Sequence, residues 1–409
     1  MKHISRRNFL KTAAALVAFP TIIPASVRGQ NAPSNHINVG QIGLGWIGGT
    51  HLNAILGRQD TRYVAVCDVN GGRIHSVQDR INRQYGGNSC KAYRDFREML
   101  AQPDLDAVII ATPDHWHCLI TCAAARAGKD IYCEKPLSLT IREGREIVTT
   151  VNRYGRVFQT GSQQRSSSFG PFRQACEVVR SGRLGQIISV DVSTGDAPKP
   201  CDLPAQPVPA DFDWEMWVGQ TPWRPYHSSL ADKQWRPYRE YCGGGFADMG
   251  AHHFDIAQWG LNMDRSGPVE VLAPNPRVSF RYANGVIVNH VGGNCLGLTF
   301  NGTAGKLYIG RDGFHSDPAN LARAPLSVTD VRLYNSNDHH GNWLQCIRTR
   351  ARCVADVETG HRSATVCHLG NIAYELGRSL KWDPVKEQFA GDEQANRLLS
   401  RARREPWVA

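Results

Sequence analysis

The chain has 409 residues, of which 41% are hydrophobic, and at roughly 100–200 residues per domain this length predicts two globular domains. Its formal net charge is +10, but residues 1–28 hold five basic side chains and no acidic one, so subtracting these five leaves +5 for the rest. Because this excess is modest and no basic run is interleaved with aromatic residues, the composition predicts no nucleic-acid partner.

The N-terminus resembles a twin-arginine export signal. Paired arginines stand before an apolar stretch that is too short to span a bilayer comfortably, and small residues follow that stretch. The residues that fill the motif are Ser5, Arg6, Arg7, Phe9, Leu10 and Lys11. We therefore expect residues 1–35 to be a signal peptide with a linker, and the folded protein to pass through the twin-arginine translocase into the periplasm. A basic segment before a buried helix is the alternative interpretation.

The remainder of the chain shows no sign of a membrane anchor. No cysteine directly follows the apolar run of the leader, and no later stretch is long and apolar enough to cross a membrane. The twelve cysteines leave the disulfide state open, because several lie in apolar strand or helix patterns where free cysteine is common; these are Cys67, Cys118, Cys122 and Cys133. No C-x-x-C pair occurs, so the cysteines predict no zinc site.

Residues 36–158 alternate short apolar strands with segments of helical length. The strands are INVGQIG, YVAVCDV, DAVIIATP, DIYCEKP and GRVFQTG. Strands separated by helical segments pair in parallel through right-handed crossovers. The pattern therefore predicts an α/β domain of the Rossmann type with a doubly wound parallel sheet.

Residues 159–409 mix strands and helices in a different order. The expected helices lie at 168–181, 246–260, 340–350 and 362–380, and the expected strands at 186–194, 276–293 and 298–310. This order predicts an α+β domain built on an open, mainly antiparallel sheet. The irregular segment 196–240 holds eight prolines and four tryptophans. We interpret it as a loop that wraps an aromatic-lined binding face, or else as a belt between domains or subunits.

A glycine-rich turn directly follows the first predicted strand. Gly43, Gly45 and Gly48 stand in G-x-G-x-x-G register. The first glycine permits a tight turn, the second lets a pyrophosphate approach the backbone, and the third allows close packing of helix on strand. The backbone N–H groups of Trp46 and Ile47 would face that anion at the positive end of a helix dipole. The turn therefore predicts a dinucleotide site.

Asp68 ends the second strand, 25 residues after Gly43, close to the spacing of about 20 expected for a ribose-binding acid. A carboxylate at this position accepts hydrogen bonds from both ribose hydroxyls and repels a 2′-phosphate, so NAD is favoured over NADP. Arg73 is the reason to keep NADP open, because an arginine nearby can bind that phosphate.

Together with this turn, four further motifs resemble the Gfo/Idh/MocA oxidoreductases. They are ATPDHWH at 111–117, CEKP at 133–136, TGSQQR at 160–165 and GGGFADMGAHHFD at 243–255. The segment 360–378 resembles a bacterial subgroup with export leaders. The resemblance implies an enzyme that acts on sugars or polyols with a tightly held nicotinamide nucleotide, in subunits that commonly associate as homo-oligomers.

The resemblance places Lys135 beside the nicotinamide and the substrate hydroxyl, and the chemistry agrees. Oxidation of an alcohol builds alkoxide-like charge on the oxygen, which an ammonium group at hydrogen-bond distance stabilises. Pro136 disfavours helical geometry at Lys135, so the lysine should be extended at the strand end. A surface charge at a strand end is the alternative.

Asp248 and His252 are the family's substrate-site pair, with the histidine as general base or acid. Residues four apart share one face of a helix, and an imidazole suits proton transfer near neutral pH. We expect Asp248 to orient His252. His253 is turned about 100° round the helix and is the weaker candidate. Helix capping by Asp248 and packing by His252 remain the alternative.

The resemblance also assigns residues to the nucleotide and to the sugar. Those expected at the nucleotide are Thr112, Pro113, His117, Glu134, Lys135 and Gln163. Arg165 is expected at the substrate, where it would clamp a carboxylate if the substrate is a uronic acid. No metal is expected, because Asp255 does not complete a ligand face with Asp248 and His252 and no HExxH motif occurs.

These observations favour an NAD-dependent oxidoreductase that transfers hydride to or from a secondary hydroxyl of a sugar or polyol. One alternative is a glycosidase that transiently oxidises its substrate with bound NAD, eliminates the leaving group and then re-reduces the sugar. A second is a non-catalytic carbohydrate-binding protein that keeps a nucleotide as a structural plug.

Overall fold

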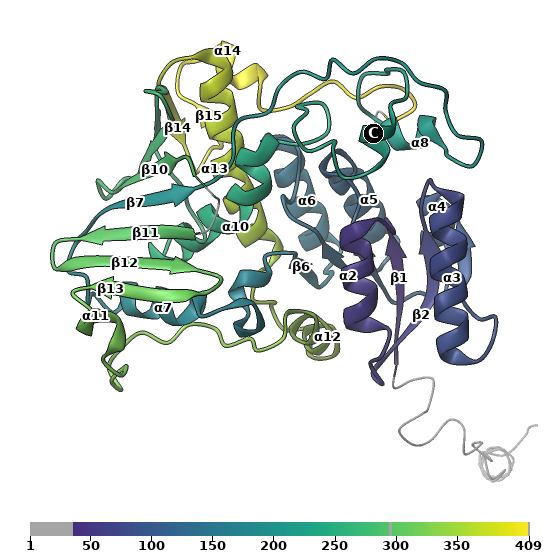
Figure 1. Ribbon diagram of the computed structural model, residues 1–409, viewed down its shortest axis with the longest axis horizontal. Helices are drawn as coiled ribbons and strands as arrows, with labels where there is room; N and C mark the ends of the chain where they lie inside the picture. Colours follow the sequence, from purple (N-terminus) through teal and green to yellow (C-terminus); the bar gives the residue numbers. More distant parts are fainter. Residues whose placement is uncertain (1–35, 294–296, 408–409) are drawn as a thin grey trace, which may run out of the picture.

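The computed structural model describes residues 36–293 and 297–407, which form two β-sheets with helices between and around them (Figure 1). The expected leader, residues 1–35, lies outside the described residues. Within the described part of the chain, no helix combines the length and the apolar character that a membrane crossing requires.

The first sheet has six strands, all parallel, in the order β3-β2-β1-β4-β5-β6. Its strands are β1 (Ile37–Ile42), β2 (Thr61–Cys67), β3 (Lys91–Tyr93), β4 (Ala107–Ile110), β5 (Asp130–Cys133) and β6 (Phe158–Thr160). Its helices are α2 (Trp46–Ile55), α3 (Gly71–Tyr85), α4 (Phe96–Leu100), α5 (Asp114–Arg126) and α6 (Ile141–Arg153). The predicted doubly wound fold is confirmed, and its strand order reverses between β1 and β4, where such sheets bind ligands.

The second sheet has nine strands in the order β13-β12-β11-β7-β10-β9-β8-β14-β15, and only the β7/β10 pair is parallel among the described strands. The predicted mainly antiparallel sheet is thus confirmed. Its strands are β7 (Ile187–Ser193), β8 (Glu270–Leu272), β9 (Ser279–Arg281), β10 (Ile287–Val291), β11 (Gly297–Gly302), β12 (Gly305–Gly310), β13 (Gly313–Asp317), β14 (Leu380–Asp383) and β15 (Gln388–Phe389).

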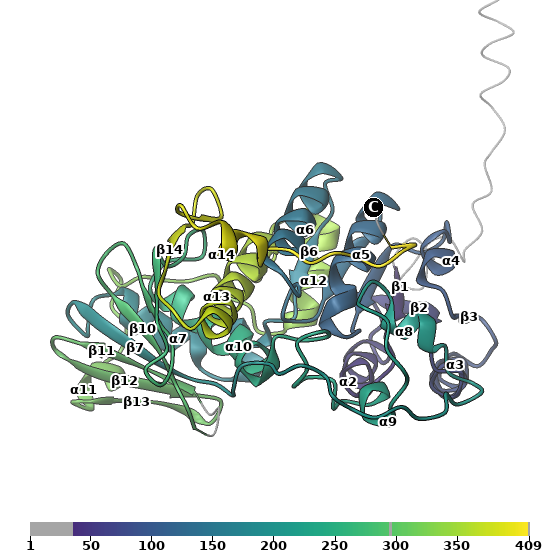
Figure 2. The ribbon, with the colours of Figure 1, turned by 90° about the horizontal axis from the view of Figure 1, so that it is seen from above.

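Helices α7 (Phe172–Arg180), α10 (Gly244–Gly260) and α13 (Val357–Leu376) pack against one face of this sheet and share its hydrophobic core. α13 also packs on α6, so it lies between the two sheets (Figure 2). α12 (His339–Thr349) places Trp343 and Leu344 in the core under the first sheet. The shorter helices are η3 (Gln163–Arg165), η4 (Ser167–Phe169), α8 (Trp214–Val218), α9 (Ser228–Ala231), α11 (Asn320–Arg323) and α14 (Glu393–Arg397).

Residues 196–240, which we call the strap, cross from the second sheet to the carboxyl edge of the first. The backbone N–H of Gly71 donates to Asp211 over 3.0 Å, and that of Asp213 donates to Val69 over 2.9 Å. Most aromatic side chains of the strap pack on one another in a separate buried cluster. The strap therefore acts as a belt over the first domain, while its Trp217 and Trp235 also reach the pocket described next.

Candidate active site

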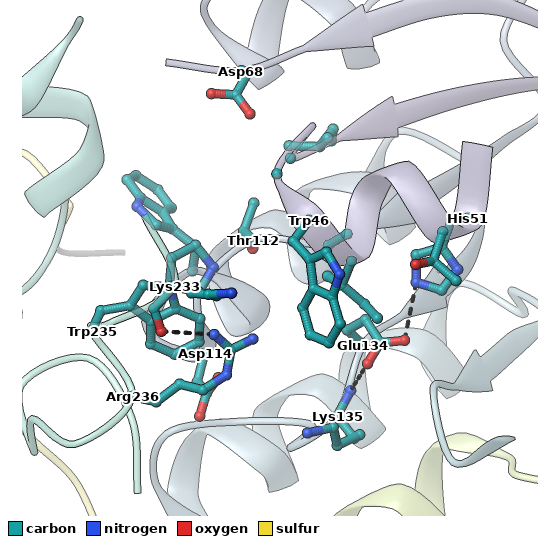
Figure 3. A pocket seen from close by; sticks show the side chains of 18 of the residues that line it. Trp46, His51, Asp68, Thr112, Asp114, Glu134, Lys135, Lys233, Trp235 and Arg236 are labelled. Atoms are coloured by element: carbon teal, nitrogen blue, oxygen red, sulfur yellow. Dashed lines mark hydrogen bonds and ion pairs between the residues drawn. The ribbon is translucent and has the colours of Figure 1, made fainter. Parts of the chain in front are cut away.

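A pocket of about 340 Å³ lies between the carboxyl ends of the first sheet, the strap and α10 (Figure 3). It brings together most residues that the sequence assigned to a site, although they come from distant parts of the chain. These are Gly43, Gly45, Trp46, Ile47, Asp68, Arg73, Thr112, Pro113, Glu134, Lys135, Gln163, Asp248 and His252. The roles assigned to them stay predictions.

The glycine turn has the geometry that a dinucleotide needs. Gly43 has a positive φ of 91°, and a Cβ there would come within 2.5 Å of the Ala111 carbonyl oxygen. A Cβ on Gly48 would come within 2.3 Å of the Gly43 oxygen, so Gly48 packs the helix on the turn and does not line the pocket. No side chain caps the first turn of α2, whose N–H groups therefore remain for a pyrophosphate.

Asp68 lies at the end of the pocket opposite Lys135 (Figure 3). Its carboxylate accepts hydrogen bonds from the backbone N–H groups of Leu44 (2.7 Å) and Asn70 (2.9 Å). Burial raises the pKa of Asp68, against the opposing effect of these bonds and of Arg73. Arg73 donates to the Ala231 carbonyl of the strap over 3.1 Å. This end therefore presents the expected ribose acid, with the arginine partly engaged by the strap.

Lys135 and Asp248 form an ion pair between the two domains. The Lys135 ammonium donates to the Asp248 carboxylate over 2.6 Å and to its carbonyl over 2.8 Å. Burial alone would lower the pKa of Lys135, but Asp248 and Glu134 outweigh it and raise that pKa. Burial would likewise raise the pKa of Asp248, but Lys135 and Arg236 lower it. Both groups are charged at neutral pH, and one ammonium proton remains for a ligand.

His252 lies one helical turn after Asp248 and is 6% exposed. Burial, together with the nearby charges of Lys135 and Arg311, lowers its pKa well below the ordinary value, so the ring is neutral and able to accept a proton. Among the described residues its Nδ1 has no hydrogen-bond partner, and the residue lines the pocket. His253 instead bonds the Ser193 carbonyl over 2.7 Å and does not line the pocket.

The expectation that Asp248 orients His252 is wrong. The carboxylate of Asp248 bonds Lys135 and lies 3.4 Å from Arg236, and no hydrogen bond joins it to His252 in the described structure. Cations outcompete a neutral imidazole for a carboxylate, because their hydrogen bonds are charge-assisted. Asp248 therefore positions the lysine.

Glu134 is supported by His51, which the sequence analysis missed, and by Gln163, which it assigned to the nucleotide. His51, from α2, lies 3.0 Å from the Glu134 carboxylate and 2.8 Å from the ring of His340. Gln163 donates to the same carboxylate over 2.7 Å, and Figure 3 shows Glu134 between His51 and Lys135. Burial would raise the pKa of Glu134, but His51 and Lys135 lower it. His51 follows the glycine turn, yet only the tertiary fold reveals its partners.

Asp114 is a further pocket residue that the sequence analysis passed over, although it stands inside the ATPDHWH motif. Burial, helped by the nearby Asp248 carboxylate, raises the pKa of Asp114 to about 7, against the opposing effects of Cys242 and Lys135. The group therefore titrates near neutral pH.

The proposed substrate role of Arg165 is contradicted by its burial. The side chain is 2% exposed and does not line the pocket. Its guanidinium donates to both carboxylate oxygens of Asp255 (2.7 and 2.8 Å) and to Asp264 (2.7 Å), and it stacks over Trp259. Because its donors are used inside the core, Arg165 ties η3 to α10 and cannot clamp a substrate.

His117 also differs from its expected role at the nucleotide. Its ring nitrogens lie 2.7 Å from the Pro136 carbonyl and 3.0 Å from the Thr112 carbonyl, and the residue does not line the pocket. The ring holds together two backbone segments that do line it.

Asp255, considered above as a metal ligand, is held by Arg165 and Ser363. Among the described residues, one group has ligand atoms close enough to bind a metal: Cys118, Cys122 and Glu146, outside the pocket. Arg403 already donates to Cys118 and Glu146 there.

Two family models match the chain. One, described as the oxidoreductase family, NAD-binding Rossmann fold, matches residues 37–162. The other, described as the oxidoreductase family, C-terminal alpha/beta domain, matches residues 173–409. The first domain is therefore an NAD-binding Rossmann domain.

Similar proteins include an inositol 2-dehydrogenase from Rhizobium meliloti, 29% identical over 238 residues, which are 58% of either chain. A glycosyl hydrolase family 109 protein from Shewanella baltica is 30% identical over 178 residues, 37% of this chain and 38% of that protein. The chain spans little more than half the length of the first curated relatives it matches. The WlbA dehydrogenase from Bordetella pertussis, solved with NADH and UDP-GlcNAcA, has the same fold, with a TM-score of 0.61, 18% identity and coverage of 85% of this chain and 99% of that one.

Replacing Arg165 with methionine should destabilise the protein strongly, because Asp255 would remain as an unpaired buried charge. We expect a loss of about 3–5 kcal/mol in the free energy of unfolding, measured by urea denaturation. The exposed Arg126, changed to methionine, is the matched control and should stay within about 0.5 kcal/mol of the wild type. Equal losses in both variants would contradict the assignment of Arg165.

Asp114 predicts a pH-dependent stability. With a pKa of about 7 in the folded state against 3.8 ordinarily, it keeps its proton over a range in which the unfolded chain has lost it. The folded state therefore binds more protons, and stability falls as pH rises through this range. Asp114→Asn should remove this loss, so its stability relative to wild type should increase by roughly 2–3 kcal/mol between about pH 5 and pH 8. If the free energy of unfolding changes equally with pH in the two proteins, the raised pKa of Asp114 is refuted.

Proposed function

The chain belongs to the Gfo/Idh/MocA oxidoreductase family, and on that premise we propose that it transfers hydride between NAD and a secondary hydroxyl of a sugar or polyol. The observation that carries this proposal is the convergence of Lys135, Asp248 and His252 in one pocket with the glycine turn. Lys135 lies two residues after β5 of the first domain, whereas Asp248 and His252 lie on α10 of the second.

The proposed roles follow from the charges of these groups. Lys135 donates a hydrogen bond from its remaining N–H to the substrate oxygen, and this bond stabilises the negative charge that develops there. His252, neutral because of burial and nearby cations, takes the hydroxyl proton. Asp248 keeps the ammonium charged and aimed. NAD, when bound, supplies the hydride acceptor.

The contacts of the strap are evidence for a cofactor that stays bound between turnovers. It contacts the first domain on both sides of α3's start, and its Lys233 lies 6.0 Å from the ring centre of Trp46, across the pocket. Arg404 fastens the strap from the C-terminal segment by donating to the Gly219 carbonyl over 2.8 Å. A retained cofactor suits a protein in the periplasm, where free nucleotide is scarce, and export through the leader is part of this proposal, as is homo-oligomerisation.

Asp68 supports NAD over NADP in the same proposal. A 2′-phosphate at this end of the pocket would meet the Asp68 carboxylate, and Arg73 is already engaged with the strap backbone.

Bound nucleotide provides the first test. Denaturing the purified protein should release NAD, identified by mass spectrometry, and adding a panel of sugars and polyols to the native protein should raise the absorbance of the reduced nicotinamide. Lys135→Ala should retain the nucleotide but lower the rate of this reduction about 10²–10³-fold, as expected for the loss of one group that stabilises developing charge. Lys381→Ala, on an exposed strand position, is the control. Reduction at the wild-type rate in Lys135→Ala would contradict the mechanism, whereas no reduction by any sugar or polyol in the wild type would favour a binding protein.

A redox-assisted glycosidase is the second candidate, favoured by the similarity to the glycosyl hydrolase family 109 protein and by the strap over the pocket. Such an enzyme oxidises and then re-reduces the sugar, so it turns over without added nucleotide. Incubation with nitrophenyl glycosides in the absence of nucleotide tests it. Release of nitrophenol that Lys135→Ala abolishes would establish the glycosidase, and no release from any glycoside would leave the dehydrogenase.

A further inference from the structure

Arg311 is a cation in the pocket for which the described residues supply no hydrogen bond, ion pair or ring contact. It stands in the turn between β12 and β13 and lines the pocket together with His252 and Phe169. Arg311 is an exposed residue, and its charge helps to lower the pKa of His252, which lines the same pocket. The turn itself is supported, because a Cβ on Gly170 would lie 3.3 Å from the Arg311 carbonyl oxygen.

The other cations at the Lys135 end of the pocket already have partners. Lys135 bonds the Asp248 carboxylate, and the Arg236 Nε lies 3.4 Å from the same carboxylate. Arg236 also donates to the Lys233 carbonyl and stacks on Trp235. The Asp248 carboxylate is therefore paired with these two cations and does not neutralise Arg311.

Asp68 and Asp232 also line the pocket, but they lie toward Arg73, whose guanidinium donates to the Ala231 carbonyl. The acids nearer to Lys135 do not compensate Arg311 either. Glu134 is held on the other side of Lys135 by His51 and Gln163. Asp114, with its pKa of about 7, is only partly ionised at neutral pH. Asp312, the sequence neighbour of Arg311, lies outside the pocket lining, and no ion pair joins the two residues in the described part of the chain. The Lys135 end of the pocket therefore has a positive charge in excess, and such an excess in a concave site attracts anions.

We propose that the substrate is a sugar or polyol carrying an anionic group, a carboxylate or a phosphate, and that Arg311 binds this group. The proposal rests on the proposed function and narrows its substrate class. A guanidinium is suited to this task because it donates two parallel hydrogen bonds to a carboxylate or phosphate. Phe169 and Trp235, which also line the pocket, offer apolar faces for the carbon skeleton. Arg311, in the turn between β12 and β13, thus takes the anion-binding role that the sequence analysis assigned to Arg165.

The test compares neutral sugars with their anionic counterparts. Each aldose is paired in turn with its uronic acid, with its aldonic acid and with its phosphate. Reduction of the bound nucleotide is followed for the wild type, for Arg311→Ala and for Lys306→Ala, an exposed control on the same hairpin. The wild type should prefer one anionic member of a pair. Arg311→Ala should raise the KM for that member about 10- to 100-fold, the value of one charge-assisted hydrogen bond, and should raise the KM for the neutral sugar much less. Preference for a carboxylate over a phosphate, or the reverse, identifies the group.

Calorimetric titration of the NAD-loaded proteins measures binding of the anionic sugar without turnover. It therefore tests the role of Arg311 independently of the redox reaction. If no sugar reduces the nucleotide, the redox function fails, yet the anionic member should still bind the wild type at least 10-fold more tightly than it binds Arg311→Ala. Equal binding by these two proteins, or an equal loss for the neutral and anionic members, would overturn the role of Arg311. Lack of any preference for the anionic members in the wild type would overturn the substrate class.

Discussion

The ion pair between Lys135 and Asp248 is the contact on which the site depends. It joins the end of β5 in the first domain to α10 in the second, with donor and acceptor 2.6 Å apart. Either charge alone would be costly in this partly buried position, and each is stabilised by the other. The pair keeps the ammonium charged, and because Asp248 and His252 share a helix, it also fixes where the imidazole stands relative to the lysine.

The core explains how that helix is held. Arg165 binds Asp255 on α10 from the segment that follows β6, so the chain after the first sheet is tied to the same helix. α13 packs on α10 on one side and on α6 on the other. The strap then covers the carboxyl edge of the first sheet and places Arg236 beside Asp248. Besides the ion pair, α13 and the strap thus hold α10 against the nucleotide-binding domain, and Arg165 fixes α10 to the segment that follows β6.

The sequence predicted what short patterns encode. The glycine turn, Asp68 and the alternation of strands and helices are local features, and all of them correspond to the first domain as found. The errors concern side chains whose partners lie far away in sequence. Arg165 was predicted to bind the substrate, but in the structure its guanidinium is paired with Asp255 and Asp264. His51 and Arg311 carry no local signal. The ring beside His51 comes from α12, and Arg311 lines its pocket together with residues of η4 and α10.

A crystal structure with NAD and a substrate analogue bound tests the central claim most directly. The measurement is the distance from the Lys135 ammonium and from the nearer ring nitrogen of His252 to the analogue oxygen beside C4 of the nicotinamide. The account predicts that both lie within hydrogen-bond reach of that oxygen, about 2.6–3.2 Å. A lysine turned away from the ring, or an imidazole some 10 Å or more beyond contact with it, would contradict the catalytic assignment.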